Sequence, residues 1–146
     1  MDIILIAAVT ADGLIARHSH EMIDWSQDLH VFKKQTMNYP VIMGSNTFKC
    51  MKNELSGRMI IVIHRGDKPK TVLENIKSDK CFIAGGGRTN ALFSQYLTHL
   101  YLTPHPYVFG KGVPLFYKMK EELQLKLIHK YTVNEEIEQL QYRVVR

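Results

Sequence analysis

The chain has 146 residues, a length that predicts one domain, residues 1-146, with a substantial buried core. Hydrophobic residues make up 45% of it, but no apolar run reaches the roughly 18 residues of a membrane helix, and no signal-peptide pattern is present. We therefore expect a cytoplasmic protein without a membrane partner. The net charge of +5 favours anionic partners, and a phosphorylated or carboxylated small molecule fits it as well as nucleic acid does.

Cysteine and histidine usage excludes two further classes of site. Cys50 and Cys81 lie far apart in sequence, which indicates buried free thiols rather than a disulfide framework. The seven histidines are scattered, and His18 and His20 have neither a cysteine partner nor the spacing of helical metal ligands. We expect no metal site.

Apolar runs and turn residues predict alternating strands and helices. Runs of strand length predict buried strands at 3–9, 41–44, 59–63, 81–84 and 100–103. Capping residues and apolar spacing predict helices at 26–35, 45–52, 71–77 and 89–97, the first capped by Ser26. The chain then predicts a hairpin, with strands at 123–128 and 137–145 and a turn at 134–136.

This order predicts an α/β fold with a mostly parallel central sheet flanked by helices, and an antiparallel C-terminal hairpin at its edge. Ligands of such sheets bind beyond the carboxyl ends of the strands. The segments expected there are Thr10–Gly13, Gly44–Thr47, His64–Arg65, Gly85–Asn90 and Thr103.

Two strand-to-helix turns in this set are candidate anion sites. Gly85, Gly86 and Gly87 can form either a tight turn or a close approach to a bulky ligand, with backbone N–H groups free for an anion. The stretch lacks the G-x-G-x-x-G spacing of a dinucleotide fold. The turn at Gly44–Thr47 can offer N–H groups and a hydroxyl to phosphates, or Ser45 can simply cap the helix.

Three further residues are candidates for ligand contacts. Asp28 precedes Leu29 and Phe32, which are expected to point to the core and leave the carboxyl at the rim of an apolar pocket. There it can bind a protonatable nitrogen heterocycle, or it can merely complement the helix dipole. Arg58 and Arg65 follow turn and strand ends and can grip a carboxylate or a phosphate, or they can be solvated surface residues.

The order of these motifs resembles the dihydrofolate reductase family over nearly the whole chain. The resemblance is carried by the following motifs: Ile4-Leu5-Ile6-Ala7-Ala8-Val9, Trp25 with Asp28-Leu29-x-x-Phe32-Lys33, Pro40-Val41-Ile42-Met43-Gly44-x-x-Thr47, Leu55-x-Gly57-Arg58, Ile83-x-Gly85-Gly86-Gly87-Arg88 and Leu100-Tyr101-Leu102-Thr103. Each motif alone is common, and their shared order makes the resemblance specific.

The resemblance implies a role for each matching position. Asp28 would be the substrate-pocket acid, assisted by Thr103, and Trp25 would close a mobile loop. The implied substrate contacts are Ile6, Ala8, Phe32, Met51, Leu55 and Arg58, the last holding a glutamate carboxylate. The implied NADPH contacts are Ala8, Ile15, Gly44, Ser45, Asn46, Thr47, His64, Arg65, Gly85, Gly86, Gly87, Arg88, Thr89 and Asn90. The bond between Gly85 and Gly86 is expected to be cis.

The chain also departs from the family pattern. Ser45 stands where a basic residue is common, Asp24 replaces a proline, Asn90 replaces an aromatic residue, and Trp25 and Asp28 are two residues closer than usual. Two segments, 11–16 and 110–116, are more similar to the reductase domain of riboflavin biosynthesis. The glutamate typical of that domain is Ala84 here.

These observations predict an NADPH-dependent reductase of 7,8-dihydrofolate with a small-molecule substrate and no nucleic-acid partner. One alternative is a reductase of a phosphoribosylaminopyrimidine in riboflavin biosynthesis. Another is a basic nucleotide-binding module without turnover. The sequence leaves the oligomeric state open, monomer or homodimer.

Overall fold

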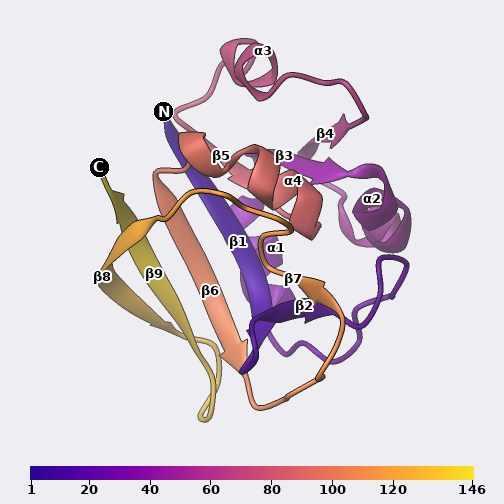
Figure 1. The fold of residues 1–146 in the computed structure, drawn as a ribbon, viewed down its shortest axis with the longest axis vertical. Coiled ribbons are helices and arrows are strands. Elements are labelled where there is room, and N and C mark those ends of the chain that lie inside the picture. The colour runs from indigo at the N-terminus through magenta and orange to yellow at the C-terminus, as the bar shows by residue number, and fades with distance from the viewer.

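A seven-stranded sheet forms the centre of the computed structural model, which describes residues 1–146 (Figure 1). Its strand order is β4-β3-β5-β1-β6-β9-β8. The strands are β1 Asp2–Thr10, β3 Pro40–Gly44, β4 Met59–Ile63, β5 Lys80–Ile83, β6 His99–His105, β8 Gln124–Thr132 and β9 Glu138–Val145. The five strands from β4 to β6 pair in parallel, and β9 and β8 add antiparallel at one edge. The predicted fold class and terminal hairpin are confirmed.

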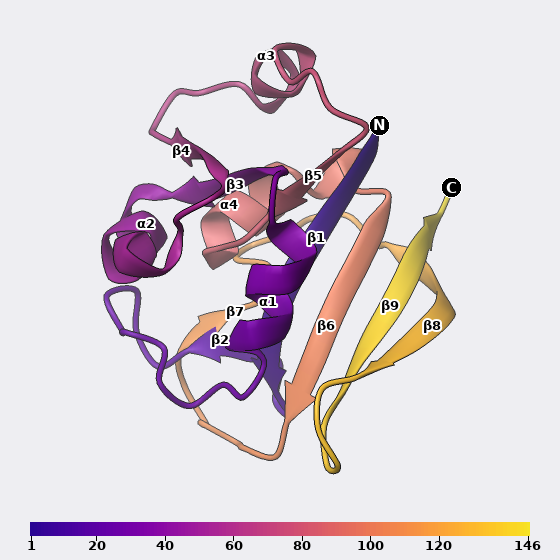
Figure 2. The ribbon, with the colours of Figure 1, turned by 180° about the vertical axis from the view of Figure 1, so that it is seen from behind.

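Helices cover both faces of the sheet, as opposite views show (Figures 1 and 2). Helix α4 lies in front of the strands in the first view, and α1 lies in front of them in the second. The helices are α1 Leu29–Thr36, α2 Ser45–Met51, α3 Pro69–Glu74 and α4 Gly87–Leu92, with short 3-10 turns η1 Lys52–Glu54 and η2 Ser94–Tyr96. No helix is both long and apolar enough to cross a membrane.

The core consists of two apolar layers, one on each face of the sheet. Successive side chains of a strand point to opposite faces, so Ile3 and Leu5 pack in one layer and Ile4 and Ile6 in the other. The second layer contains Phe32 of α1, which places that helix on this face of the sheet. The continuous apolar run of β1 is therefore explained by burial on both sides.

The structure corrects the predicted helix boundaries. The first helix begins at Leu29 rather than after Ser26, because Asp28 occupies the N-cap position. The fourth helix ends at Leu92 and continues only as a 3-10 turn. The side chain of Leu29, predicted to face the core, is 38% exposed.

Two short strands lie outside the predicted strands and helices. β2 Leu14–Ala16 pairs antiparallel with β7 Val113–Pro114 and forms a second sheet. This two-stranded sheet anchors the start of the segment that follows β2, residues 17–25. We call this segment the 17–25 loop.

Candidate active site

A single cavity of about 1320 Å³ extends along the carboxyl ends of the parallel strands, under the 17–25 loop. Most of the predicted site residues line it: Ile6, Ala8, Ile15, Trp25, Asp28, Phe32, Gly44, Ser45, Asn46, Thr47, Met51, His64, Arg65, Gly85, Gly86, Gly87, Arg88, Thr89 and Asn90. Pockets for one small molecule are usually about 300–1,000 Å³, so this one has room for two ligands side by side.

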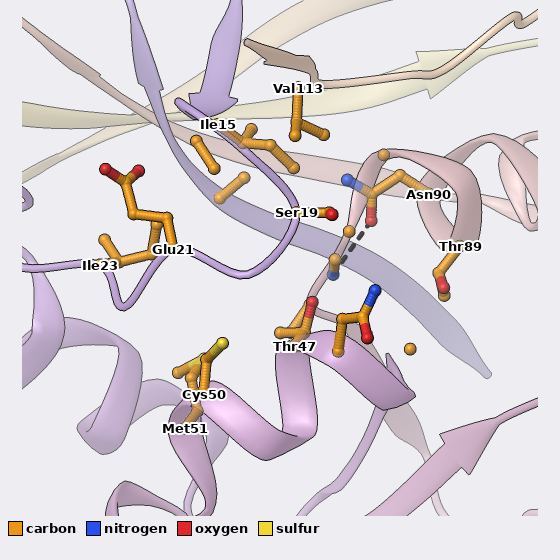
Figure 3. A pocket seen from close by; sticks show the side chains of 18 of the residues that line it. Ile15, Ser19, Glu21, Ile23, Thr47, Cys50, Met51, Thr89, Asn90 and Val113 are labelled. Carbon is orange, nitrogen blue, oxygen red and sulfur yellow. Dashed lines mark hydrogen bonds between the residues drawn. The ribbon is translucent and has the colours of Figure 1, made fainter.

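The two glycine turns form one continuous floor. The Gly44 N–H donates to the Gly85 carbonyl over 2.9 Å, which joins the end of β3 to the end of β5. A Cβ at Gly44 would lie 2.9 Å from Thr89 Oγ1, so a larger residue here would require the Thr89 side chain to move. Asn90 Oδ1 accepts from the Gly85 N–H at 3.1 Å (Figure 3). The Gly85–Gly86 peptide bond is cis, as the resemblance implied.

Asp28 lines the cavity from the N-cap position of α1. Asp28 is only 8% exposed, and it lines the pocket together with the apolar side chains of Ile6 and Phe32. An aspartate at an N-cap usually accepts a hydrogen bond from the first helical turn, but the Asp28 side chain makes no such bond. Helix capping therefore does not occupy its carboxylate, which remains available to a ligand in an otherwise apolar part of the cavity.

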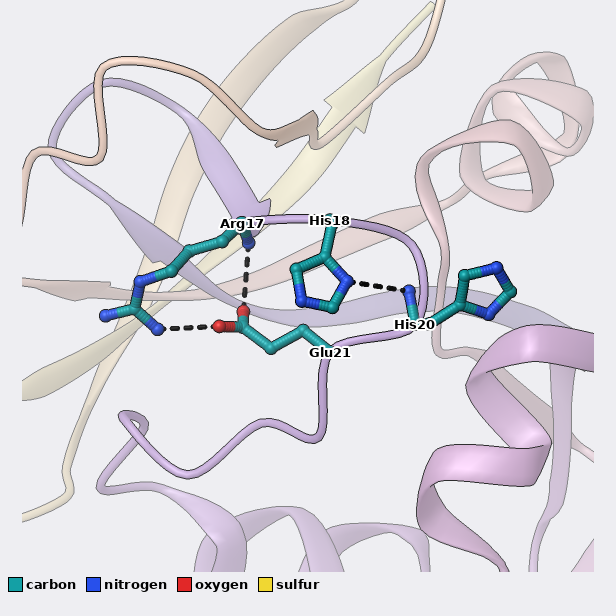
Figure 4. A network of polar contacts seen from close by, with 4 residues as sticks. All are labelled: Arg17, His18, His20 and Glu21. Carbon is teal, nitrogen blue, oxygen red and sulfur yellow. Dashed lines mark hydrogen bonds and ion pairs between the residues drawn. The ribbon is translucent and has the colours of Figure 1, made fainter.

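The 17–25 loop lines the cavity and is braced internally by polar contacts between its own residues (Figure 4). The Arg17 guanidinium donates to the Glu21 carboxylate at 2.6 Å, and the Arg17 backbone N–H donates to it at 2.9 Å. Burial by itself would raise the pKa of Glu21, but the Arg17 hydrogen bonds and charge outweigh it and hold this pKa below its ordinary value. The Glu21 carboxylate is therefore ionised at neutral pH and forms an ion pair with Arg17.

Trp25 ends the loop in an aromatic cluster. Its indole meets the rings of His105, Tyr107 and Phe109 edge-on, with centroids 5.3, 6.1 and 5.3 Å away. Trp25 is 7% exposed and still borders the cavity. The residue thus anchors the loop to the segment after β6, and its role in loop closure stays a prediction.

Three predicted site residues lie outside the cavity lining. The Arg58 guanidinium is engaged by Thr36 Oγ1 at 3.0 Å and by the backbone carbonyls of Lys33 and Ser56. These contacts turn it towards the end of α1 and away from the pocket. Leu55 is buried in the core layer beside the pocket.

Thr103 is the third of these residues. It is fully buried, and its Oγ1 has no hydrogen-bond partner within the protein. Its strand neighbour in β1 is Ala8, which does line the cavity. The Thr10–Gly13 segment, also expected at the site, instead forms a turn in which Thr10 Oγ1 donates to Asp12 Oδ1 at 2.5 Å.

Several lining residues were not predicted from the sequence. They come mainly from loops and include Ser19, Glu21, Ile23, Cys50, Glu54, Lys111 and Tyr117. Loop residues carry no periodicity that would assign them to a face, and only the 110–116 motif drew attention to one of these regions.

Both cysteines are free, but only Cys81 is buried, so the expectation of two buried thiols is wrong for Cys50. Burial raises the pKa of the Cys81 thiol to about 11, although the positive charge of the N-terminus lowers it slightly. Cys50 is partly exposed, faces the cavity, and lies 3.5 Å from the His20 carbonyl of the 17–25 loop (Figure 3).

Known proteins resemble this chain in sequence and in fold. The profile of the dihydrofolate reductase family matches residues 2–145. The dihydrofolate reductase type 3 of Salmonella typhimurium is 31% identical over 119 residues, covering 70% of this chain and 71% of that protein. The dihydrofolate reductase of Lactococcus lactis subsp. lactis (strain IL1403) is 35% identical over 88 residues, 49% of this chain and 52% of that one.

Two solved structures share the fold at lower identity. The dihydrofolate reductase from Enterococcus faecalis complexed with NADP(H) and RAB-propyl has a TM-score of 0.77 and 18% identity, with 99% of this chain and 97% of that chain covered. A protein from Shewanella sp. PV-4, whose name places it in riboflavin biosynthesis, has a TM-score of 0.74 and 21% identity over 100% of both chains. The match of the family profile to almost every residue shows that this chain belongs to the dihydrofolate reductase family.

Proposed function

We propose that this protein reduces 7,8-dihydrofolate to tetrahydrofolate with NADPH as the hydride donor. The observation that carries the proposal is the placement of Asp28, a buried carboxylate that faces an apolar part of the cavity and is not used to cap its helix. A carboxylate in that setting suits the protonatable nitrogens of a pterin ring. Family membership and the relatives named as dihydrofolate reductases support the same substrate.

The opposite half of the cavity fits a phosphorylated cofactor. Its floor consists of the two glycine turns, where backbone N–H groups can meet phosphate oxygens closely. His64 and Arg65 follow β4 and line the same half, and their exposed side chains can reach a phosphate at its rim. The cofactor would be held by these residues with its reactive end towards Asp28. NADPH, when bound, supplies the hydride for the C=N carbon of the substrate.

The protein's own contribution is to position and polarise the substrate. Asp28 would hold the pterin ring by hydrogen bonds and favour protonation of the nitrogen that becomes an amine. The buried Thr103 hydroxyl, which has no partner in the protein, lies at the strand position paired with the lining residue Ala8, and the family resemblance implies that it assists Asp28. Ile6, Phe32 and Met51 would flank the ring and exclude water, which strengthens these polar contacts. Orientation of this kind supplies a large part of enzymatic rate enhancement.

Reduction of a phosphoribosylaminopyrimidine is the second candidate, favoured by the fold shared with the Shewanella protein and by the β2–β7 pair built from the segments similar to that domain. Such a substrate carries a phosphate, yet Arg58, the arginine expected on the substrate side, is held by Thr36, Lys33 and Ser56 outside the cavity lining. The placement of Asp28 and the relatives named as dihydrofolate reductases favour dihydrofolate over this substrate.

The decisive measurement follows NADPH oxidation at 340 nm with each substrate in turn. We expect turnover with dihydrofolate and little or none with the pyrimidine. Turnover with the pyrimidine alone would instead assign the protein to riboflavin biosynthesis. NADPH binding without turnover of either substrate would leave the non-catalytic nucleotide-binding alternative.

Arg65→Ser tests the cofactor half of the site. If the guanidinium meets the 2′-phosphate, its loss removes a charge-assisted hydrogen bond of about 1.5–3 kcal/mol, so the Kd for NADPH should rise by about tenfold or more. The Kd for NADH, which lacks that phosphate, should change by less than about twofold. Fluorescence titration measures both values. Lys126→Ser removes an equal charge on β8, away from the cavity, and should change neither; equal weakening of both cofactors by Arg65→Ser would contradict the assignment.

A further inference from the structure

His105 is a buried histidine at the end of β6 to which the proposed reaction gives no part. It is 2% exposed, and both ring nitrogens are hydrogen-bonded. The Gln27 backbone N–H donates to Nε2 at 2.9 Å, and Nδ1 lies 2.8 Å from the Thr103 carbonyl oxygen. An amide N–H can only donate and a carbonyl oxygen can only accept, so the two bonds together require a neutral ring protonated on Nδ1.

The partner on Nε2 connects this ring to the proposed active site. Gln27 directly precedes Asp28, so the imidazole holds the backbone one residue before the acid. On the other side, the Asp28 carbonyl accepts hydrogen bonds from Val31 and Phe32, the first turn of α1. The Asp28 backbone is therefore held upstream by His105 and downstream by the helix.

Asp28 depends on this backbone placement because its side chain has no capping bond of its own to orient it. The ring is itself held by Trp25, whose indole meets it edge-on at 5.3 Å. One imidazole thus joins three parts of the site: the end of the 17–25 loop, the start of α1, and the β6 strand that carries Thr103.

We propose that His105 is a positioning residue for Asp28: as the Nδ1–H tautomer it ties Gln27 to β6 and keeps the Asp28 carboxyl aimed into the cavity. The inference rests on the proposed function, since it takes Asp28 as the group that meets the substrate. Displacement of a catalytic group by about 1 Å can cost on the order of a hundredfold in rate.

The first experiment compares variants that keep different parts of the ring's contacts. His105→Phe keeps the packing against Trp25 but neither hydrogen bond, and His105→Asn can keep only the contact near Nδ1. Both should lower kcat with dihydrofolate by about 10- to 100-fold. His105→Gln places an acceptor near the position of Nε2. Its log kcat should therefore recover at least a third of the difference between His105→Phe and the wild type. The Kd for NADPH should stay within about twofold in all three, because the glycine turns are distant from this contact.

His99→Phe is the matched control. His99 begins the same strand, contacts Thr98 Oγ1 through Nδ1, and does not border the cavity. This variant should keep the wild-type kcat. Thermal denaturation of every variant confirms that it is folded at the assay temperature. Equal kcat in His105→Phe and the wild type would overturn the proposal.

A double-mutant cycle separates positioning from general loss of structure. If His105 acts through Asp28, adding His105→Phe to Asp28→Asn should lower kcat by less than about twofold beyond Asp28→Asn alone. Effects that multiply would overturn the inference but leave the proposed function intact. An Asp28→Asn enzyme with wild-type turnover would overturn the proposed role of Asp28 and the inference with it.

The tautomer gives a readout that requires no activity. In water the neutral imidazole prefers the Nε2–H form, so an Nδ1–H form is specific to these contacts. Nitrogen-15 spectra of the wild-type protein at pH 8 should show a protonated Nδ1 and an unprotonated Nε2 for His105. The opposite tautomer would overturn the proposal whatever the substrate is.

Discussion

Asp28→Asn is expected to lower kcat for dihydrofolate reduction near neutral pH by about 10²- to 10⁴-fold, the usual contribution of a positioned acid or base. The amide keeps the size of the side chain but cannot carry the negative charge that favours a protonated ring nitrogen. The Kd for NADPH should remain within about twofold, because the cofactor half of the cavity lies at the glycine turns. Steady-state kinetics and fluorescence titration measure the two effects separately.

Asp79→Asn is a suitable control for this substitution. Asp79 is an exposed acid before β5 and does not border the cavity, so the variant should keep its kcat. Loss of NADPH affinity in parallel with kcat in Asp28→Asn would show that Asp28 supports the fold of the pocket rather than the reaction.

Gly87→Ala is expected to destabilise the protein by about 1–3 kcal/mol, as overpacked sites do. A Cβ at Gly87 would lie 2.5 Å from the backbone oxygen of Pro114 and 3.2 Å from Val113 Cγ1. The oxygen belongs to β7, so it cannot move without disturbing the pairing of β7 with β2. Urea denaturation measures the change in the free energy of unfolding.

Gly86→Ala separates packing from ligand binding in the same turn. The nearest atom to a Cβ at Gly86 is Thr47 Oγ1 at 3.7 Å, an ordinary contact, so the stability should change by less than the Gly87→Ala value. Gly86 lines the cavity, and the added methyl group should instead weaken NADPH binding. If Gly87→Ala were as stable as Gly86→Ala, the third glycine would not be needed for the contact with β7.

The strands and the general place of the site follow from local pattern. The run Met59–Ile63 was predicted with the bounds that β4 has, because a continuous apolar run of this length is typical of a strand even where, as here, the strand lies at the edge of the sheet. Gly44 and Gly85 were expected at strand ends, and the rule that parallel sheets bind ligands at their carboxyl edge then placed them together.

Side-chain directions were predicted less well. Leu29 follows Asp28 at a helix start, and nothing local shows that the helix begins three residues after Ser26 and turns Leu29 outwards. The direction of Arg58 is set by acceptors at Lys33, Ser56 and Thr36, of which only Ser56 is close in sequence. A long flexible side chain takes the direction of its partners.

The α/β class, the strand positions, the glycine turns and Asp28 as the candidate acid could be predicted from the sequence, because periodicity and turn chemistry are local properties of the chain. The set of side chains that meet in the cavity depends instead on the tertiary structure. Trp25 at the end of the 17–25 loop meets the rings of His105, Tyr107 and Phe109, and His105 meets Gln27 across 78 positions of sequence. Contacts of that kind depend on the packing of whole elements, and no local pattern encodes them.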